Sequence, residues 1–166
     1  NSIGDVTWDD TCENSHAINV LGIPMVVMGA KNMVIAASHD GILVADKHQS
    51  SYIKDCLSHI SDTSKYEERR WGTIKTIDND EDNGSKRVTK RIKVVAGKRT
   101  PEADMNHTQT ITVLSGMGKL ILEGVEVDLM AGATVSIAAG KTYSIQALGS
   151  DLRCIEISIS KSKENA

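Results

Sequence analysis

Two segments that each begin with glycine, 97–116 and 132–147, constrain the fold of this chain more than any other feature. In the first segment, six residues separate Gln109 from Gly116, and the second segment carries Tyr143 near its centre. The glycines allow tight turns, and the β-branched residues between them favour sheet. The two segments therefore predict short strands joined by tight turns.

The composition allows a hydrophobic core without Phe. About 40% of the 166 residues are apolar, and the aromatic residues are two Trp and three Tyr, so Ile, Val, Leu, Met and Ala must fill the core. The length suits one domain or two small ones. The net charge is −3, with acidic and basic residues interspersed, so no nucleic-acid partner is expected.

Cysteine usage and hydropathy indicate a cytoplasmic protein. Cys12, Cys56 and Cys154 lie far apart, without metal-ligand or redox spacing, which is typical of free thiols in a reducing compartment. No signal peptide or apolar run of membrane-spanning length is present, so no membrane partner is expected. The chain begins at Asn1 rather than Met, and we expect it to be a fragment of a longer protein.

The first part of the chain, residues 1–62, contains short apolar runs broken by turn residues. This pattern predicts either a few coils of β-helix or a small sheet packed on a neighbour. A helix with a Ser cap is expected to start near Ser51, because Tyr52, Ile53, Cys56, Leu57 and Ile60 follow at helical spacing. The polar residues after Ile60 predict a domain boundary near 62.

The second part, residues 67–160, is expected to form a closed barrel or a sandwich of many short strands. A strand is predicted at 73–77, and the acidic run 78–84 is predicted to be a hairpin loop rather than a calcium site, because it lacks the spacing of calcium ligands. Further strands are predicted at 86–95, 109–114, 119–122, 125–129, 133–138, 142–147 and 152–159. Residues 161–166 form a polar tail.

Together, the segments 97–116 and 132–147 resemble the two motifs of a cupin, a double-stranded β-helix barrel. In metal-binding cupins these motifs supply two His, a Glu and a third His. Here the corresponding positions hold Asp104, Asn106, Gln109 and Tyr143. Neutral amides and a phenol are poor ligands for zinc or iron. The resemblance therefore implies a degenerate cupin, and we expect no metal and no cofactor.

Six residues are candidates for a pocket in the barrel: Lys90, Asp104, Asn106, His107, Gln109 and Tyr143. They either bind a sugar or sugar phosphate or form a buried hydrogen-bonded cluster in place of the metal. Lys90 shares a face with Val88 and Ile92, so its amine meets a phosphate or reaches the end of the barrel. His107 is expected to lie in a loop on the surface. No catalytic residue is assigned, because no Ser/His/Asp or Cys/His constellation is visible.

Nearly the whole chain resembles the C-terminal region of the bifunctional type II mannose-6-phosphate isomerase/mannose-1-phosphate guanylyltransferase family. The similarity in the second part is carried by 70–72, 90–92, Gly97, 115–116, Gly132, Gly140 and 155–157. In the first part it is carried by 18–19, 23–25, 31–34 and 38–47. Their order matches the linker segment and the cupin that follow the nucleotidyltransferase domain of this family.

This resemblance implies a parent protein that makes GDP-mannose. The family's glycine-rich nucleotide loop has no counterpart here, so the transferase site is expected to lie in a domain upstream of this chain. The chain itself is then expected to serve packing and homo-oligomerisation, for example as a dimer. Two alternatives stay open: a cupin that isomerises a sugar phosphate, and a pocket that senses a sugar phosphate or sugar nucleotide.

Overall fold

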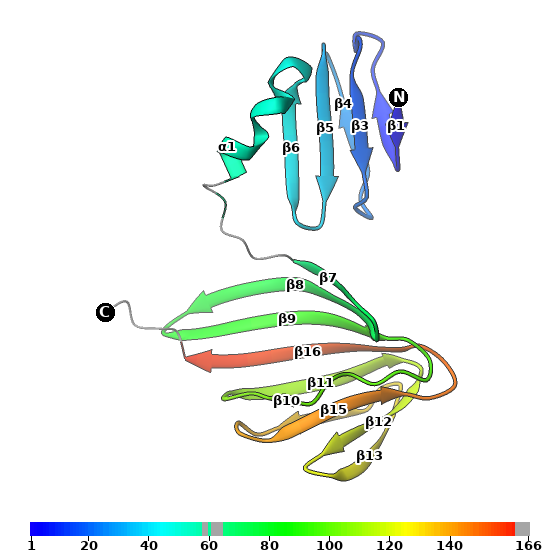
Figure 1. Ribbon diagram of the computed structural model, residues 1–166, viewed down its shortest axis with the longest axis vertical. Coiled ribbons are helices and arrows are strands. Elements are labelled where there is room, and N and C mark those ends of the chain that lie inside the picture. Colours follow the sequence, from blue (N-terminus) through cyan, green and yellow to red (C-terminus); the bar gives the residue numbers. More distant parts are fainter. Residues whose placement is uncertain (58–59, 61–64, 162–166) are drawn as a thin grey trace. The chain divides into compact units, whose positions relative to one another are not determined.

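The computed structural model describes residues 1–57, 60 and 65–161. The chain divides into two compact units, Asn1–Ser64 and Lys65–Ala166. The boundary predicted near residue 62 falls among residues outside the described ones. Strands dominate both units (Figure 1), which confirms the prediction of a mainly β protein. No helix among the described residues has the length and apolar character needed to cross a bilayer.

The first unit is a short stack of β-helical coils. Its strands are β1 (Ser2–Ile3), β2 (Val6–Trp8), β3 (His16–Asn19), β4 (Met25–Val27), β5 (Met33–Ser38) and β6 (Gly41–Asp46). β1, β3 and β5 pair in parallel, as do β2 and β4, while β6 pairs antiparallel to β5. Ser2 pairs with Ala17, and Ala17 with Ile35, so the chain returns to the same sheet on each coil. This parallel pairing confirms the β-helix-like segment.

Small residues and one amide hold these coils together. Ala17, Val27 and Ala37 are buried inside the stack. The buried Asn19 side chain donates through Nδ2 to the carbonyl oxygens of Asp5, at 2.9 Å, and Ile23, at 2.8 Å. Because one side chain satisfies backbone groups of two separate turns, the irregular connections keep their hydrogen bonds without regular strands.

The helix after β6 starts earlier than the sequence indicated. A 3₁₀ helix, η1 (Lys47–Tyr52), runs directly into α1 (Ile53–Leu57). Its N-cap is Asp46, whose carboxylate accepts from the His48 backbone N–H at 2.8 Å. The prediction of a Ser cap near Ser51 was therefore wrong, because an Asp in extended conformation already caps the turn. Tyr52 and Ile60 are 61% and 62% exposed, so they do not form a buried stripe.

The second unit consists of two antiparallel sheets (Figure 1). Its strands are β7 (Tyr66–Arg69), β8 (Gly72–Asp82), β9 (Ser85–Val94), β10 (Ala103–Asp104), β11 (Thr108–Ser115), β12 (Met117–Leu122), β13 (Val125–Met130), β14 (Thr134–Ile137), β15 (Thr142–Ala147) and β16 (Leu152–Lys161). The six-stranded sheet has the order β14-β11-β16-β9-β8-β7, and the four-stranded sheet has the order β10-β15-β12-β13. Such sheets, packed face to face, enclose one core.

The acidic run 78–84 is not a loop, as the sequence suggested. β8 extends to Asp82, and only Asn83 and Gly84 form the turn to β9, both with positive φ. This is the two-residue Asn-Gly hairpin turn. Cross-strand bases offset the acidic charges, since the Arg87 guanidinium lies 2.5 Å from the Asp80 carboxylate.

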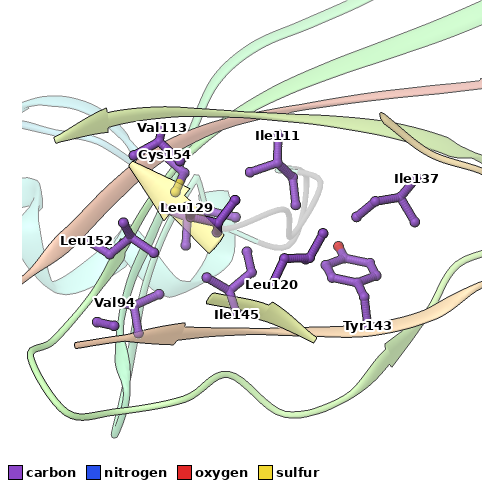
Figure 2. Packing of buried hydrophobic residues seen from close by; sticks show 12 residues of the cluster. Val94, Ile111, Val113, Leu120, Leu129, Ile137, Tyr143, Ile145, Leu152 and Cys154 are labelled. Carbon is purple, nitrogen blue, oxygen red and sulfur yellow. The ribbon is translucent and has the colours of Figure 1, made fainter. Parts of the chain in front are cut away.

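Aliphatic side chains from both sheets fill the interior of the second unit (Figure 2). Ile111, Leu120, Leu129, Ile145 and Leu152 are among its fully buried members. Ile111 and Leu152 take inward positions of the alternating strands β11 and β16. Tyr143 also points into this core, and its hydroxyl brings a polar group into an apolar interior.

Candidate functional site

Three polar side chains meet inside the second unit, and we call them the polar trio: Gln109, Tyr143 and Glu156. Their residues are only 1%, 5% and 6% exposed, respectively. The Tyr143 hydroxyl oxygen is hydrogen-bonded to Gln109 Oε1 and lies 3.2 Å from Glu156 Oε2. The trio therefore bridges the two sheets, because Tyr143 belongs to β15 whereas Gln109 and Glu156 belong to β11 and β16.

Strand alternation places these side chains inside. On β16, Leu152, Cys154, Glu156 and Ser158 alternate with more exposed residues, and all four are buried. Gln109 lies on the same side of β11 as the buried Ile111 and Val113. The sequence analysis did not identify Glu156. A carboxylate at an inward position of an otherwise apolar alternation is the signal that would have found it.

The hydrogen bonds of the trio require a defined arrangement of protons. A phenol has one proton, so Tyr143 cannot donate to Gln109 Oε1 and Glu156 Oε2 at the same time. Gln109 Nε2 is buried without a hydrogen-bond partner among the described residues. If the Gln109 amide is turned over, Nε2 donates to the phenol oxygen and the phenol proton is left for Glu156. Hydrogen bonds then run from Gln109 through Tyr143 to the carboxylate.

Burial keeps both ionisable neighbours of this carboxylate protonated. Desolvation, followed by the nearby Glu156 charge, raises the pKa of Tyr143 far above its usual value. The same two causes raise the pKa of the Cys154 thiol to about 11. At neutral pH, Tyr143 is therefore a neutral hydrogen-bond donor and not a phenolate.

The other four candidate residues do not join the trio in any hydrogen bond within the described structure. Asp104, on β10, pairs with Thr142 of β15 and is exposed. Its neighbour Ala103 packs against the core. Asn106 and His107 lie just before β11, with Asn106 Oδ1 3.2 Å from His107 Nδ1. Lys90, on β9, is half-buried and pairs in register with Glu156 of β16.

These side chains do not reproduce the ligands of a metal-binding cupin. Among the described residues, no three His, Cys, Asp or Glu side chains form a group that could hold a metal ion. Gln109 and Tyr143 offer neutral oxygens, and Glu156 is the only carboxylate of the trio. Zinc and iron sites are built mainly from imidazole, thiolate and carboxylate ligands. The trio therefore does not fit such an ion.

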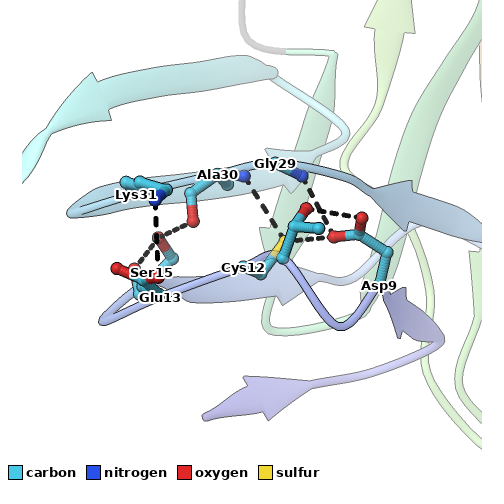
Figure 3. Close-up of polar contacts among 8 residues, drawn as sticks. Asp9, Cys12, Glu13, Ser15, Gly29, Ala30 and Lys31 are labelled. Carbon is cyan, nitrogen blue, oxygen red and sulfur yellow. Dashed lines mark hydrogen bonds and ion pairs between the residues drawn. The ribbon is translucent and has the colours of Figure 1, made fainter.

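The first unit has a polar network and a cavity of its own. The Asp9 carboxylate accepts hydrogen bonds from the Thr11 hydroxyl, the Cys12 thiol and the Gly29 backbone N–H (Figure 3). These bonds, the Thr11 hydroxyl first, lower the pKa of Asp9 to about 2. The network ties the turn after β2 to the turn after β4.

Beside this network lies an open cavity of about 340 Å³. Its lining residues are Asn1, Trp8, Asp9, Cys12, Asn14, Ser15 and His16. Asp9, Cys12, Asn14 and Ser15 already hydrogen-bond to other groups of the same unit. Most of the polar groups around the cavity therefore stabilise the coils.

Two curated relatives of this chain both carry the name mannose-1-phosphate guanylyltransferase. No family model matches the chain. The chain is 29% identical over 108 residues to a putative mannose-1-phosphate guanylyltransferase of Vibrio cholerae, covering 60% of this chain and 22% of that protein. It is 27% identical over 130 residues to the mannose-1-phosphate guanylyltransferase ManC of Salmonella typhimurium, covering 73% of this chain and 26% of that protein. The matches thus span about a quarter of the length of these relatives.

Solved structures identify the fold of the second unit. KdgF from a Halomonas species superposes with a TM-score of 0.51 at 18% identity, covering 60% of this chain and 88% of that one. A cupin-2 domain protein, Rru_A2000 from Rhodospirillum rubrum, superposes with a TM-score of 0.50 at 11% identity, covering 64% and 69%. The predicted cupin barrel is therefore confirmed.

Proposed function

We propose that this chain serves packing and assembly in a GDP-mannose-forming protein. The premise is that the chain is a relative of the mannose-1-phosphate guanylyltransferases, with a cupin as its second unit. The guanylyl transfer itself would be carried out by residues outside the chain described above. In this proposal the protein works in the cytoplasm as a homo-oligomer, and its barrel binds no metal and isomerises no sugar phosphate.

The observation that carries this proposal is the polar trio. Gln109 and Tyr143 stand at two motif positions that resemble metal-ligand positions, and there they bond to one another. Glu156 completes the set. Buried polar side chains that bond to one another stabilise a core, whereas a metal centre needs lone pairs directed at one point.

An activity assay tests this proposal. The purified chain is supplied with Zn²⁺, Co²⁺ or Mn²⁺ in turn, and conversion of mannose 6-phosphate to its ketose isomer is followed. We expect no turnover above the protein-free rate. Turnover that depends on an added ion and is lost in Gln109→Ala would overturn the non-catalytic role.

A matched variant shows that the assay can detect a metal site. The double substitution Gln109→Glu and Tyr143→His places a carboxylate and an imidazole beside Glu156, giving three ligands of the kind that zinc prefers. We expect this variant to bind Zn²⁺ more tightly than the natural chain in a calorimetric titration. Equal affinities would mean that the identity of the trio does not determine metal binding.

A second candidate function is the sensing of a sugar phosphate. It is favoured by the buried Gln109 amide, which has an unsatisfied group, and by Lys90, which faces the same side of the six-stranded sheet as Glu156. An amide, a hydroxyl and an ammonium suit a hydroxylated anion. Calorimetric titration with mannose 6-phosphate tests this reading. Binding that is lost in Lys90→Met would support it, and the absence of heat would leave the assembly role alone.

A further inference from the structure

Four basic residues lie together on the outer face of the six-stranded sheet, the face that points away from the core. On β9, the buried Ile92 separates Arg91 from Lys93, so these two side chains point outward. Lys75 of β8 is the register partner of Arg91, and Arg153 of β16 is the register partner of Lys93. The three strands are neighbours in the sheet (Figure 1). We call these four residues the basic cluster.

Both register pairs of the basic cluster place like charges directly opposite each other, which destabilises a sheet. One pair is Lys75 with Arg91, and the other is Lys93 with Arg153. In the other described ladders of the second unit, each register pair of two charged residues combines an acid with a base. These pairs are Asp80–Arg87, Glu81–Lys86, Glu156–Lys90 and Asp128–Lys119. The basic cluster is therefore an exception to the charge pairing of this unit.

The charges of the basic cluster are accessible and are not neutralised by direct contact. Within residues 1–57, 60 and 65–161, no carboxylate forms an ion pair with any of the four side chains. Arg91 and Arg153 are exposed, and Lys75 and Lys93 are half-buried. Like charges that are held side by side without an acid favour the binding of an anion.

Acidic residues around the basic cluster limit the size of this anion. Glu68 of β7 and Asp78 of β8 lie at diagonal register positions from the cluster, and Asp151 lies just before β16. Further along the same face, Asp80 and Asp82 of β8 also point outward. A long polyanion laid across the face would meet these carboxylates, whereas a compact anion would contact the bases alone. The surface therefore suits a small ligand of concentrated negative charge.

We propose that the basic cluster binds a diphosphate group, with one phosphate over each Lys–Arg pair. Each pair supplies a guanidinium, which can donate two parallel hydrogen bonds to phosphate oxygens, and an ammonium, which acts as a point charge. Neighbouring strands lie about 4.8 Å apart, and alternate residues of one strand lie about 6.8 Å apart, so the long side chains of both pairs can converge on one ligand. In register beside the second pair, the hydroxyls of Thr73 and Ser115 offer further donors.

This site is separate from the polar trio, because Gln109 and Glu156 face the inner side of the same sheet. The proposal therefore goes beyond the assembly role and does not depend on it. A single phosphate would engage only one Lys–Arg pair. Free pyrophosphate and a nucleoside diphosphate carry the same diphosphate group, so the experiment compares these two sources.

Titration of the full chain with inorganic pyrophosphate, followed through the backbone amide signals in nuclear magnetic resonance, tests the proposal. At about 150 mM salt and without Mg²⁺, we expect saturable shifts around the basic cluster and a dissociation constant below about 1 mM. Inorganic phosphate should bind at least about tenfold more weakly, because it reaches one pair only. Equal affinities for GDP and pyrophosphate would identify the diphosphate group alone as the ligand, and tighter binding of GDP would identify a nucleoside diphosphate.

A double variant tests the residues. Arg91→Gln/Arg153→Gln removes one guanidinium from each pair and should weaken pyrophosphate binding at least about tenfold. The matched control, Arg87→Gln/Lys119→Gln, removes the same charge from bases that are paired with acids and should bind normally. In urea denaturation, the cluster variant should be no less stable than the natural chain, because each substitution removes a like-charge contact.

Three results would overturn the proposal: no saturable shifts, shifts centred on the polar trio instead of the basic cluster, or equal weakening by the two double variants. A cluster variant that is clearly less stable than the natural chain would assign the four bases to the fold and would overturn the proposal as well. None of these results changes the assembly role, which is tested by the turnover assay with added metal ions.

Discussion

At the scale of single residues, the second unit is distinguished by a carboxylate kept inside an apolar barrel. Glu156 is 6% exposed and Tyr143 is its hydrogen-bond donor. A buried acceptor that loses its donor stays desolvated and has no hydrogen bond to compensate for the lost contact with water, which destabilises the folded state. The Tyr143 hydroxyl therefore stabilises the fold and links the two sheets.

Removal of this hydroxyl should destabilise the second unit. Tyr143→Phe leaves the ring in place but leaves Glu156 without the phenol proton, so we expect the free energy of unfolding to fall by about 1–3 kcal/mol. Urea denaturation measures the change. Tyr52→Phe, at a position 61% exposed, is the control and should change stability by less than about 0.5 kcal/mol. Equal effects of the two substitutions would contradict a stabilising trio.

Alkaline pH should destabilise the chain through Cys154. Burial raises the pKa of this thiol from 9.0 to about 11, so between these values the unfolded chain loses a proton that the folded chain keeps. Stability is fully present below pH 9 and falls by about 1.4 kcal/mol per pH unit as the pH rises towards 11. Denaturation at several pH values measures the slope. The slope should become shallower in Cys154→Ala and stay unchanged in Cys56→Ala, whose thiol is exposed.

At the scale of elements, strands and their turns account for the second unit. Gly116 connects β11 to β12 with φ near +88°, and a Cβ at this position would lie 2.2 Å from the Asp151 carbonyl oxygen. Two independent constraints therefore require glycine, one from the backbone angle and one from the neighbouring chain. This glycine ends the first of the two segments that constrained the fold from sequence.

Alanine at Gly116 should be far more costly than alanine at an open glycine. We expect Gly116→Ala to lower the free energy of unfolding by more than about 1 kcal/mol, because the strain adds to the close contact. Gly149→Ala is the matched control, since a Cβ there meets nothing within 4 Å and φ is not positive. Thermal denaturation compares the two variants. A stable Gly116→Ala would show that the backbone adjusts at this turn.

Alternation was sufficient to predict strands such as β11 and β16, because inward and outward residues differ clearly there. It failed for residues 78–82. There acidic residues suggested a loop, although cross-strand partners such as Arg87 keep them in β8. It also failed for the helix after β6, where the Asp46 cap was overlooked.

The candidate site was predictable only in part. Motif spacing led to Gln109 and Tyr143, whose side chains are in contact. Glu156 lies on a strand outside both motifs, and only the pairing of β16 with β9 and β11 brings it to the other two. That pairing depends on residues far apart in the sequence, so local patterns could not identify the third member of the trio.

At the scale of the whole molecule, a β-helical unit and a cupin unit occur in one chain that matches about a quarter of two guanylyltransferases. The inside of the barrel holds the closed polar trio. The proposed assembly role needs no chemistry from the interior. A catalytic role would need a metal or an acid–base pair in the interior.

The most direct test of this account is the metal content of the purified chain. The protein is prepared without chelator from medium supplemented with zinc, iron and manganese, and its bound metal is measured by mass spectrometry alongside the Gln109→Glu/Tyr143→His variant. The account predicts far less than one ion per natural chain and near one per variant chain. Near one ion per natural chain, lost when Glu156 is replaced by Gln, would contradict it and make metal-dependent isomerisation the leading function.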